Sequence, residues 1–274
     1  MQPSVNPEFA TELLAPADFS DDKYTRGTIG FVTGSEKYPG AALLGINAAF
    51  ELGIGMVRYL GPETVSHLVL SNRPETVLGL DRASVLVLGS GIADDEAGVQ
   101  KENLLSVQDL DVPLVIDAGA MQIVDLAKVK GPAVLSPHHA EAQRLLTKLG
   151  EDWTREEIEQ ETQEAATSLA QKTGLAVLLK GNISYVAIPG FEPMESGPGS
   201  THLATAGTGD VLAGMIGTLI AKAIARGLPI TTGSLAEIAL IANQLHSEAA
   251  EWAAQRGQFG ASAVCDAISS VVTG

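Results

Sequence analysis

Short apolar runs alternate with amphipathic or small-residue segments over most of this chain. Several of the runs are continuously apolar, which is typical of strands that are buried on both faces of a sheet. The predicted strands are 28–33, 55–60, 84–88, 113–117, 133–136, 176–180 and 184–188. The predicted helices are 41–52, 94–107, 140–149, 155–172, 209–225, 234–256 and 261–272. This alternation predicts an α/β fold, in which a mostly parallel central sheet carries helices on both faces.

One segment breaks the parallel pattern. Gly181-Asn182 separates the runs 176–180 and 184–188, and this pair is typical of a tight antiparallel hairpin. The chain shows no internal repeat, low-complexity tract or clear linker. We therefore expect a single domain over residues 27–274, preceded by a polar, proline-bearing leader, residues 1–26, that packs over the surface.

Composition and charge narrow the class of protein. The 274 residues are 45% hydrophobic and 18% charged, which allows a sizeable core. A net charge of −16 repels phosphate backbones and anionic lipid, so neither nucleic acid nor a membrane is an expected partner. The apolar run 211–225 contains Lys222 and is expected to be too short to span a bilayer. The single cysteine, Cys265, excludes an internal disulfide and fits a cytoplasmic protein, as does the lack of a signal-peptide pattern.

The strongest candidate for chemistry is the turn Gly207-Thr208-Gly209-Asp210, where a helix is predicted to begin. The two glycines allow consecutive backbone N–H groups to converge on one anion, and the helix N-terminus adds partial positive charge. Asp210 lies in the first turn, where the helix dipole favours its ionised form. An ordinary helix start with Thr208 as the N-cap is the alternative interpretation. The glycines favour a phosphate site, because a simple cap needs neither of them.

Three further candidates follow predicted strands, at the edge where open α/β sheets bind ligands. Asp117 ends one strand, and a ligand contact and a helix cap explain it equally well. His138 opens a helix, so it either contacts a ligand or caps a surface helix. Lys180 suits a phosphate or adenine neighbour, or a lysine whose charged end simply reaches solvent.

Other glycine loops and motifs limit the choice of enzyme class. Gly89-Ser90-Gly91 resembles the start of a dinucleotide fingerprint, but Asp94 stands where the third glycine belongs, so no Rossmann site is expected. The loop before residue 41 suits close approach of a ligand or of a neighbouring chain, or is a simple crossover. The sequence lacks G-x-x-x-x-G-K-[ST], which excludes a P-loop enzyme. It also lacks H-x-x-x-H and H-E-x-x-H, so no metal cage built by the protein is expected.

Taken together, these segments resemble the ADP-dependent NAD(P)H-hydrate dehydratases, a branch of the ribokinase-like superfamily. The matching blocks are Tyr38-Pro39-Gly40-Ala41-Ala42, Leu88-Gly89-Ser90-Gly91, Ile116-Asp117-Ala118-Gly119-Ala120, Ser136-Pro137-His138, Leu179-Lys180-Gly181-Asn182 and residues 203–214. The Gly-Thr-Gly-Asp block alone marks the superfamily, and the front block with Asp-Ala-Gly-Ala and Pro-His narrows the resemblance to the dehydratases. The chain departs from the usual family pattern at Ser90, His139, Ala140 and Ala206.

The resemblance implies a ribokinase-like three-layer sandwich and a repair lyase. Its substrate would be (6S)-hydrated NADH or NADPH, its co-substrate ADP and its metal Mg²⁺. Its assembly would be a homo-oligomer, with a tetramer as the candidate. Asp210 would be the catalytic base. The residues implied at the hydrate are Ala41, Ala42, Gly91, Asp117, His138 and Asp210. The residues implied at the nucleotide are Lys180, Gly181, Asn182, Ile183, Ser184, Gly207, Thr208 and Gly209.

Two other functions are open at this point. A vitamin or sugar kinase of the same superfamily would use the same turn and base but stop at the phosphoryl ester. The block 38–42 favours the dehydratase, since that block resembles the dehydratase pattern. A non-enzymatic nucleotide sensor would bind nucleotide and tolerate the loss of Asp210.

Overall fold

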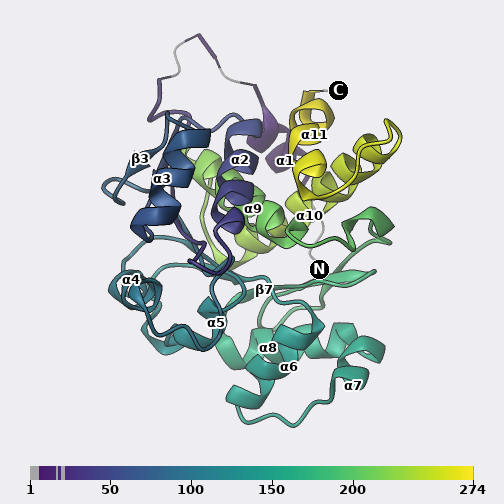
Figure 1. Ribbon diagram of the computed structural model, residues 1–274. Helices are drawn as coiled ribbons and strands as arrows, with labels where there is room; N and C mark the ends of the chain where they lie inside the picture. Colours follow the sequence, from purple (N-terminus) through teal and green to yellow (C-terminus); the bar gives the residue numbers. More distant parts are fainter. Residues whose placement is uncertain (1–5, 17, 20–21, 274) are drawn as a thin grey trace.

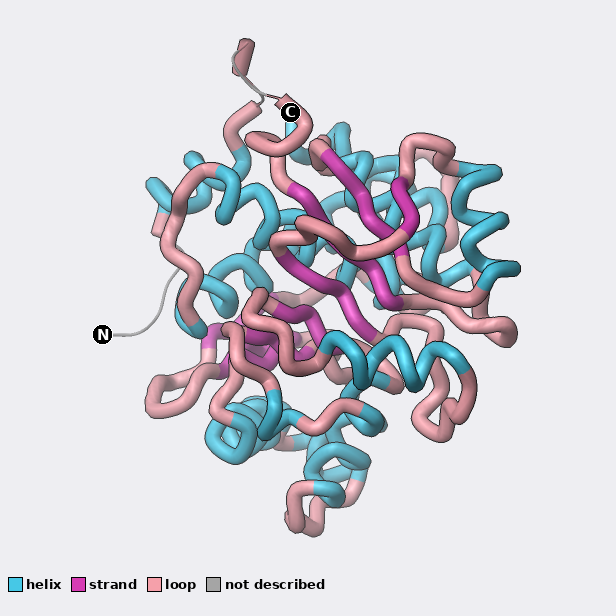
Figure 2. The backbone as a smooth tube through the Cα atoms, turned by 90° about the vertical axis from the view of Figure 1, so that its left-hand side faces the viewer, coloured by secondary structure: helices cyan, strands magenta, loops and turns pink. Residues whose placement is uncertain are grey.

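A nine-stranded sheet forms the centre of the computed structural model, which describes residues 6–16, 18–19 and 22–273 (Figures 1 and 2). The strand order is β3-β2-β1-β4-β5-β6-β7-β8-β9. The strands are β1 (Thr28–Val32), β2 (Met56–Tyr59), β3 (Val77–Leu78), β4 (Val85–Leu88), β5 (Leu114–Ile116), β6 (Ala133–Leu135), β7 (Ala176–Leu179), β8 (Ser184–Ala187) and β9 (Met194–Ser196). Neighbours from β3 to β7 are parallel, and β8 runs antiparallel to β7 and β9. The predicted mostly parallel sheet and its antiparallel hairpin are confirmed.

Helices cover both faces of the sheet, which gives three layers (Figure 1). One helical layer contains α1 (Pro7–Leu14), α2 (Gly40–Glu51), α3 (Glu63–Asn72), α9 (Thr208–Ala225), α10 (Thr232–Ala254) and α11 (Ala261–Thr273). The other contains α4 (Val99–Val107), α5 (Ala120–Ile123), α6 (His139–Lys148), α7 (Arg155–Gln160) and α8 (Thr162–Thr173). Side chains alternate along each strand, so Val87 faces the first core while Leu86 and Leu88 face the second. Both faces are therefore apolar, which explains the continuous apolar runs.

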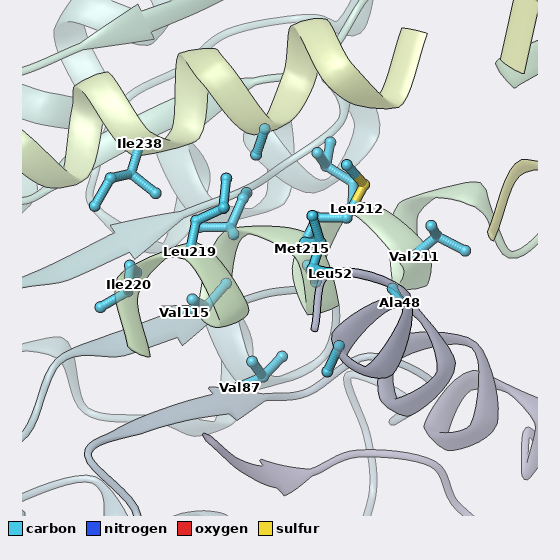
Figure 3. Close-up of a cluster of buried hydrophobic side chains, with 14 of the residues drawn as sticks. Ala48, Leu52, Val87, Val115, Val211, Leu212, Met215, Leu219, Ile220 and Ile238 are labelled. Atoms are coloured by element: carbon cyan, nitrogen blue, oxygen red, sulfur yellow. The ribbon is translucent and has the colours of Figure 1, made fainter. Parts of the chain in front are cut away.

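Helix α9 lies at the centre of the first layer, between the sheet, α2 and α10 (Figure 3). Two glycines allow this close packing. A Cβ at Gly214 would lie 2.4 Å from the Gly45 oxygen in α2, and one at Gly217 would lie 2.4 Å from Val87 in β4. The helix has the length and composition of a membrane span, so the expectation that this segment is too short is wrong. Because 72% of it is buried inside the structure, it packs as a core helix.

The structure also changes several predicted boundaries. The helix expected over 94–107 begins only at Val99, because residues 93–98 form turns. The helix expected over 155–172 is divided into α7 and α8 at Glu161, whose φ of −121° and ψ of 50° are not helical. Within the expected leader, α1 buries Leu13 in the first core, and residues 1–5, 17, 20 and 21 lie outside the described residues.

Candidate active site

The carboxyl ends of β4, β5, β6 and β7 meet in one buried polar cluster. Asp117 follows β5 and is 3% exposed. Its carboxylate accepts hydrogen bonds from the hydroxyls of Ser90 at 2.9 Å and Ser136 at 2.8 Å. The Nζ of Lys180, which follows β7, donates to the same carboxylate at 3.0 Å. Asp117 therefore holds the lysine in place. If Asp117 were only a helix cap, or if the charged end of Lys180 simply reached solvent, these contacts would not be needed.

The turn at the start of α9 completes this cluster. Gly207 has a φ of 93°, a left-handed conformation that favours glycine. Thr208 lies inside the helix, where its hydroxyl donates to the carbonyls of Leu203 and Thr205 at 2.8 and 2.9 Å. No described side chain caps this helix, so the interpretation of Thr208 as an N-cap is wrong. The Thr208 N–H makes only a long hydrogen bond of 3.4 Å, to the Thr205 carbonyl, so the first turn can still direct N–H groups to an anion beside the cluster.

Lys180 lies next to this turn. A Cβ at Gly209 would lie 3.6 Å from the Nζ of Lys180, which places the ammonium group at the positive end of α9. Burial acts against the charge of Lys180, but the carboxylates of Asp117, Glu141 and Asp210 outweigh it, so the pKa of the lysine is raised. A charged lysine and a helix N-terminus together favour a phosphate at this point.

Asp210 is the group whose environment departs most from the prediction. Burial raises its pKa to about 7, the nearby Asp117 and Glu141 carboxylates add to that rise, and Lys180 opposes it. The sequence predicted that the helix dipole would favour the ionised form, but burial and like charges have the larger effect. A carboxyl group that titrates near neutral pH is well suited to act as a general base.

A cavity of about 630 Å³ opens at this edge of the sheet, within the size range of small-molecule sites. Most of the predicted site residues line it, namely Asp117, His138, Lys180, Gly181, Asn182, Ser184, Gly207, Thr208, Gly209 and Asp210. Ile183 does not line the cavity and its side chain is exposed. The structure thus brings together the turn, the aspartates and the lysine loop.

Ala41, Ala42 and Gly91 lie outside the lining of this cavity. A Cβ at Gly91, where φ is 68°, would lie 2.3 Å from the Cβ of Ala41. Ala42 is fully buried, and a Cβ at Gly34 would lie 2.9 Å from it. These residues form a tight contact between the start of α2 and the loops after β1 and β4. Their role at the hydrate stays a prediction.

Sequence reasoning missed the wall of the cavity that α10 provides. Asn243, His246 and Ser247 line it from one helical face, because they are three and four residues apart. Asn243 donates to the Ser196 hydroxyl at 2.9 Å, and the Ser247 hydroxyl accepts from the Ser200 N–H at 2.7 Å. Burial, with Lys180 adding, lowers the pKa of His246 to about 3. The sequence signal that could have revealed these residues is their helical spacing within an otherwise apolar helix.

Comparisons with known proteins identify the family of this chain. The profile of the NAD(P)H-hydrate dehydratase family matches residues 29–272. The bifunctional NAD(P)H-hydrate repair enzyme Nnr of Mycobacterium tuberculosis is 38% identical over 218 residues, which are 76% of this chain and 43% of that protein. The chain thus spans about half the length of the first curated relatives it matches. The ADP-dependent (S)-NAD(P)H-hydrate dehydratase of Neisseria meningitidis is 33% identical over 246 residues, which are 84% of this chain and 78% of that protein.

A solved relative has the same architecture. The crystal structure of the ADP/ATP-dependent NAD(P)H-hydrate dehydratase from Bacillus subtilis, co-crystallized with ATP/Mg²⁺, matches with a TM-score of 0.79 and 25% identity. The match covers 97% of this chain and 96% of that one. Likeness to this and other solved structures confirms the ribokinase-like, three-layer fold. The chain belongs to the NAD(P)H-hydrate dehydratase family.

Proposed function

We propose that this protein is an ADP-dependent dehydratase that returns (6S)-hydrated NADH or NADPH to the reduced cofactor. One observation carries the proposal: Asp210, with a pKa near 7, shares a cavity with Lys180 and the uncapped glycine turn of α9. This set can bind a phosphate and accept a proton beside it. Family membership supplies the substrate class, since the relative from Neisseria meningitidis is named an ADP-dependent (S)-NAD(P)H-hydrate dehydratase.

The chemistry requires phosphoryl transfer before elimination. Hydroxide is a poor leaving group, because the pKa of water is about 15.7, whereas the second pKa of a phosphate ester is about 6. Asp210 takes the hydroxyl proton of the hydrate while the oxygen bonds to the terminal phosphorus of ADP, and AMP departs. The carbon–oxygen bond then breaks as the ring nitrogen supplies its electron pair. Phosphate leaves, and the neighbouring ring carbon loses a proton to form the double bond.

Other residues hold the reacting groups. The N–H groups of Gly207, Thr208 and Gly209 would stabilise the charge on the transferring phosphoryl group. Lys180 adds a full positive charge there, and the loop from Gly181 to Ser184 would bind the nucleotide. Asp117 is a poor candidate for the base, because both of its oxygens already accept hydrogen bonds. Its role is to position Lys180.

A magnesium ion fits the carboxylates of the cavity. Glu141 and Asp210 both line it, and Mg²⁺ is commonly held by one or two carboxylates together with substrate phosphates. In the part of the chain that the structure describes, no three His, Cys, Asp or Glu side chains group into a metal site. Glu141 is therefore the residue that would hold the ion together with the phosphates of ADP, which leaves Asp210 free to accept the proton. When bound, Mg²⁺ supplies charge neutralisation for phosphoryl transfer.

The remaining features of the proposal concern the protein in the cell. We propose small molecules, the hydrated cofactor and ADP, as its partners, and a cytoplasmic location where those cofactors are used. We also propose a homo-oligomer, with a tetramer as the candidate. Analytical ultracentrifugation tests the assembly, and a monomer at all concentrations would contradict it.

Nucleotide binding is tested by thermal unfolding. ADP with Mg²⁺ should raise the melting temperature of the native protein, because a ligand that binds only the folded state stabilises it. Lys180→Ala should reduce that rise, since it removes the charge beside the α9 turn. Asp210→Asn should keep most of it, because the amide still fits the site. No shift with any adenine nucleotide would contradict the proposal.

A further inference from the structure

The cavity contains a buried polar atom that has no partner within the protein. Four buried side-chain nitrogen or oxygen atoms of the described residues make no hydrogen bond, and they belong to Thr33, Arg58, Thr76 and His246. Of these residues only His246 lines the cavity, and its side chain is 3% exposed. The unpaired atom is its Nε2. Buried polar atoms are nearly always paired in folded proteins, so this nitrogen indicates a partner that a ligand supplies.

The surroundings of the ring determine what Nε2 offers. Burial and the charge of Lys180 lower the pKa of the imidazole, whereas the backbone of Thr208 raises it, which is the effect of a carbonyl beside a ring N–H. Since Nε2 is unpaired, that N–H belongs to Nδ1. Burial keeps the ring uncharged, so the second nitrogen carries a lone pair and no proton. Nε2 is therefore a hydrogen-bond acceptor.

The position of the ring determines which part of a ligand it meets. His246 lies beside Thr208, at the end of the cavity where the α9 turn and Lys180 receive phosphate. On the same face of α10, Asn243 and Ser247 line the cavity, together with Gly199, Ser200 and Thr201 of the loop before α9. These neighbours are uncharged. Ionised phosphate oxygens carry no proton to donate, so an acceptor at this boundary suits the nucleoside that is attached to the phosphates.

We propose that Nε2 of His246 accepts a hydrogen bond from an O–H or N–H group of the nucleoside part of ADP, and so makes the site prefer the nucleotide over phosphate groups alone. The donor is a ribose hydroxyl or the exocyclic amine of the base. The inference rests on the proposed function, because it assumes that ADP occupies the cavity. It gives α10 a part in binding that its apolar pattern conceals.

Calorimetric titration of the full chain tests this inference with two probes, ADP with Mg²⁺ and pyrophosphate with Mg²⁺. His246→Phe keeps the ring volume and removes both nitrogens, so its Kd for ADP should rise about tenfold, the usual worth of one buried hydrogen bond. Its Kd for pyrophosphate should change less than twofold. His246→Gln, whose amide oxygen can accept, should recover part of the loss. Gln244→Ala, at an exposed position of α10, is the matched control and should bind both probes like the native protein.

Nucleotide analogues then identify the donor. In the native protein 2′-deoxy-ADP, 3′-deoxy-ADP or inosine diphosphate, whichever lacks the donor, should bind about tenfold more weakly than ADP. His246→Phe should not discriminate against that analogue. In turnover the KM for ADP should rise in His246→Phe while kcat stays within twofold, which a disturbed fold would not produce.

Three outcomes would overturn the inference. They are equal ADP affinity in native protein and His246→Phe, equal losses for ADP and pyrophosphate, and failure of both His246→Phe and His246→Gln to fold. The last would mean that the histidine is needed for the fold and not for the ligand. Failure of the native protein to bind ADP would instead refute the proposed function, so the two failures are distinguishable.

Discussion

Among single residues, the two aspartates of the cavity illustrate how surroundings divide roles between identical side chains. Asp117 accepts hydrogen bonds from two serines and Lys180. Burial, with a smaller contribution from the neighbouring carboxylates, raises the pKa of Asp210 to about 7. A carboxylate with occupied oxygens is suited to hold another group, and one with a raised pKa is suited to accept a proton. Ser90, where this chain departs from the usual family pattern, donates one of the hydrogen bonds that fix Asp117.

The raised pKa of Asp210 predicts how activity depends on pH. A general base must be deprotonated, so kcat/KM should rise with pH and level off above the pKa of the free enzyme, near 7. Initial rates at limiting hydrate concentration between pH 5.5 and 8.5 measure this profile. The residual activity of Asp210→Asn should lack the rise. A native profile that is flat across this range would contradict Asp210 as the base.

The same shift predicts a gain in stability when Asp210 is replaced. Its pKa is higher in the folded state than the ordinary 3.8, so the unfolded chain holds fewer protons between about pH 4 and 7. The free energy of unfolding therefore falls as pH rises through that window. Asp210→Asn removes the penalty and should raise this free energy by roughly 1–3 kcal/mol at pH 8, and by less at pH 5. Urea unfolding at both pH values measures the effect, and a loss of stability at pH 8 would contradict the account.

Only part of the site could be predicted from the sequence. The α9 turn, Asp117 and Lys180 carry local signals, namely paired glycines and polar residues at strand ends. The pKa of Asp210 could not be predicted, because its burial and its carboxylate neighbours arise from other elements. The role of α10 was hidden for the same reason, since His246 faces the cavity only when α10 packs beside the start of α9.

Among elements, the contact between α2 and α9 sets where the proposed phosphate-binding turn lies. Gly214 of α9 meets the backbone of Gly45 in α2, and Gly217 meets β4. Neither position has room for a methyl group, so α9 lies against both α2 and the sheet. This contact directs the N-terminus of α9 to the carboxyl edge of the parallel strands, where Asp117 and Lys180 lie.

The substitution Gly214→Ala should therefore destabilise the folded protein. The new methyl carbon would lie 2.4 Å from a backbone oxygen of α2, which forces the helices apart and should lower the free energy of unfolding by about 1–3 kcal/mol. Gly40→Ala is the matched control, because a Cβ there meets no atom within 4 Å and the position opens a helix. Chemical denaturation measures both. Equal stability of the two variants would show that the contact between α2 and α9 does not stabilise the fold.

The elements themselves were predictable where their pattern was strong. The central strands β4, β5, β6 and β7 are continuously apolar, β1 is apolar after Thr28, and each was expected. Strands β3 and β9 were missed, because two or three residues are too few to show a period. Helix α3 was missed as well. The break at Glu161 lies between two segments of helical composition, so tertiary packing decides it.

At the scale of the whole molecule, the net charge of −16 makes anion binding depend on a few local groups. The sheet brings four strand ends together, the α2 contact places the start of α9 over them, and Lys180 supplies the positive charge. This arrangement explains how an acidic protein can bind a polyphosphate, and why the proposed activity depends on so few residues.

The most direct test of the account is repair by the purified protein of hydrated NADH or NADPH, with ADP and Mg²⁺. Near-ultraviolet absorbance reports the reduced nicotinamide, while AMP and phosphate are quantified in parallel. Absorbance should return only with ADP, and one AMP and one phosphate should form per cofactor repaired. Asp210→Asn should slow turnover by about two to four orders of magnitude. Accumulation of a stable phosphorylated product would identify a kinase instead, and unimpaired repair by Asp210→Asn would contradict the mechanism.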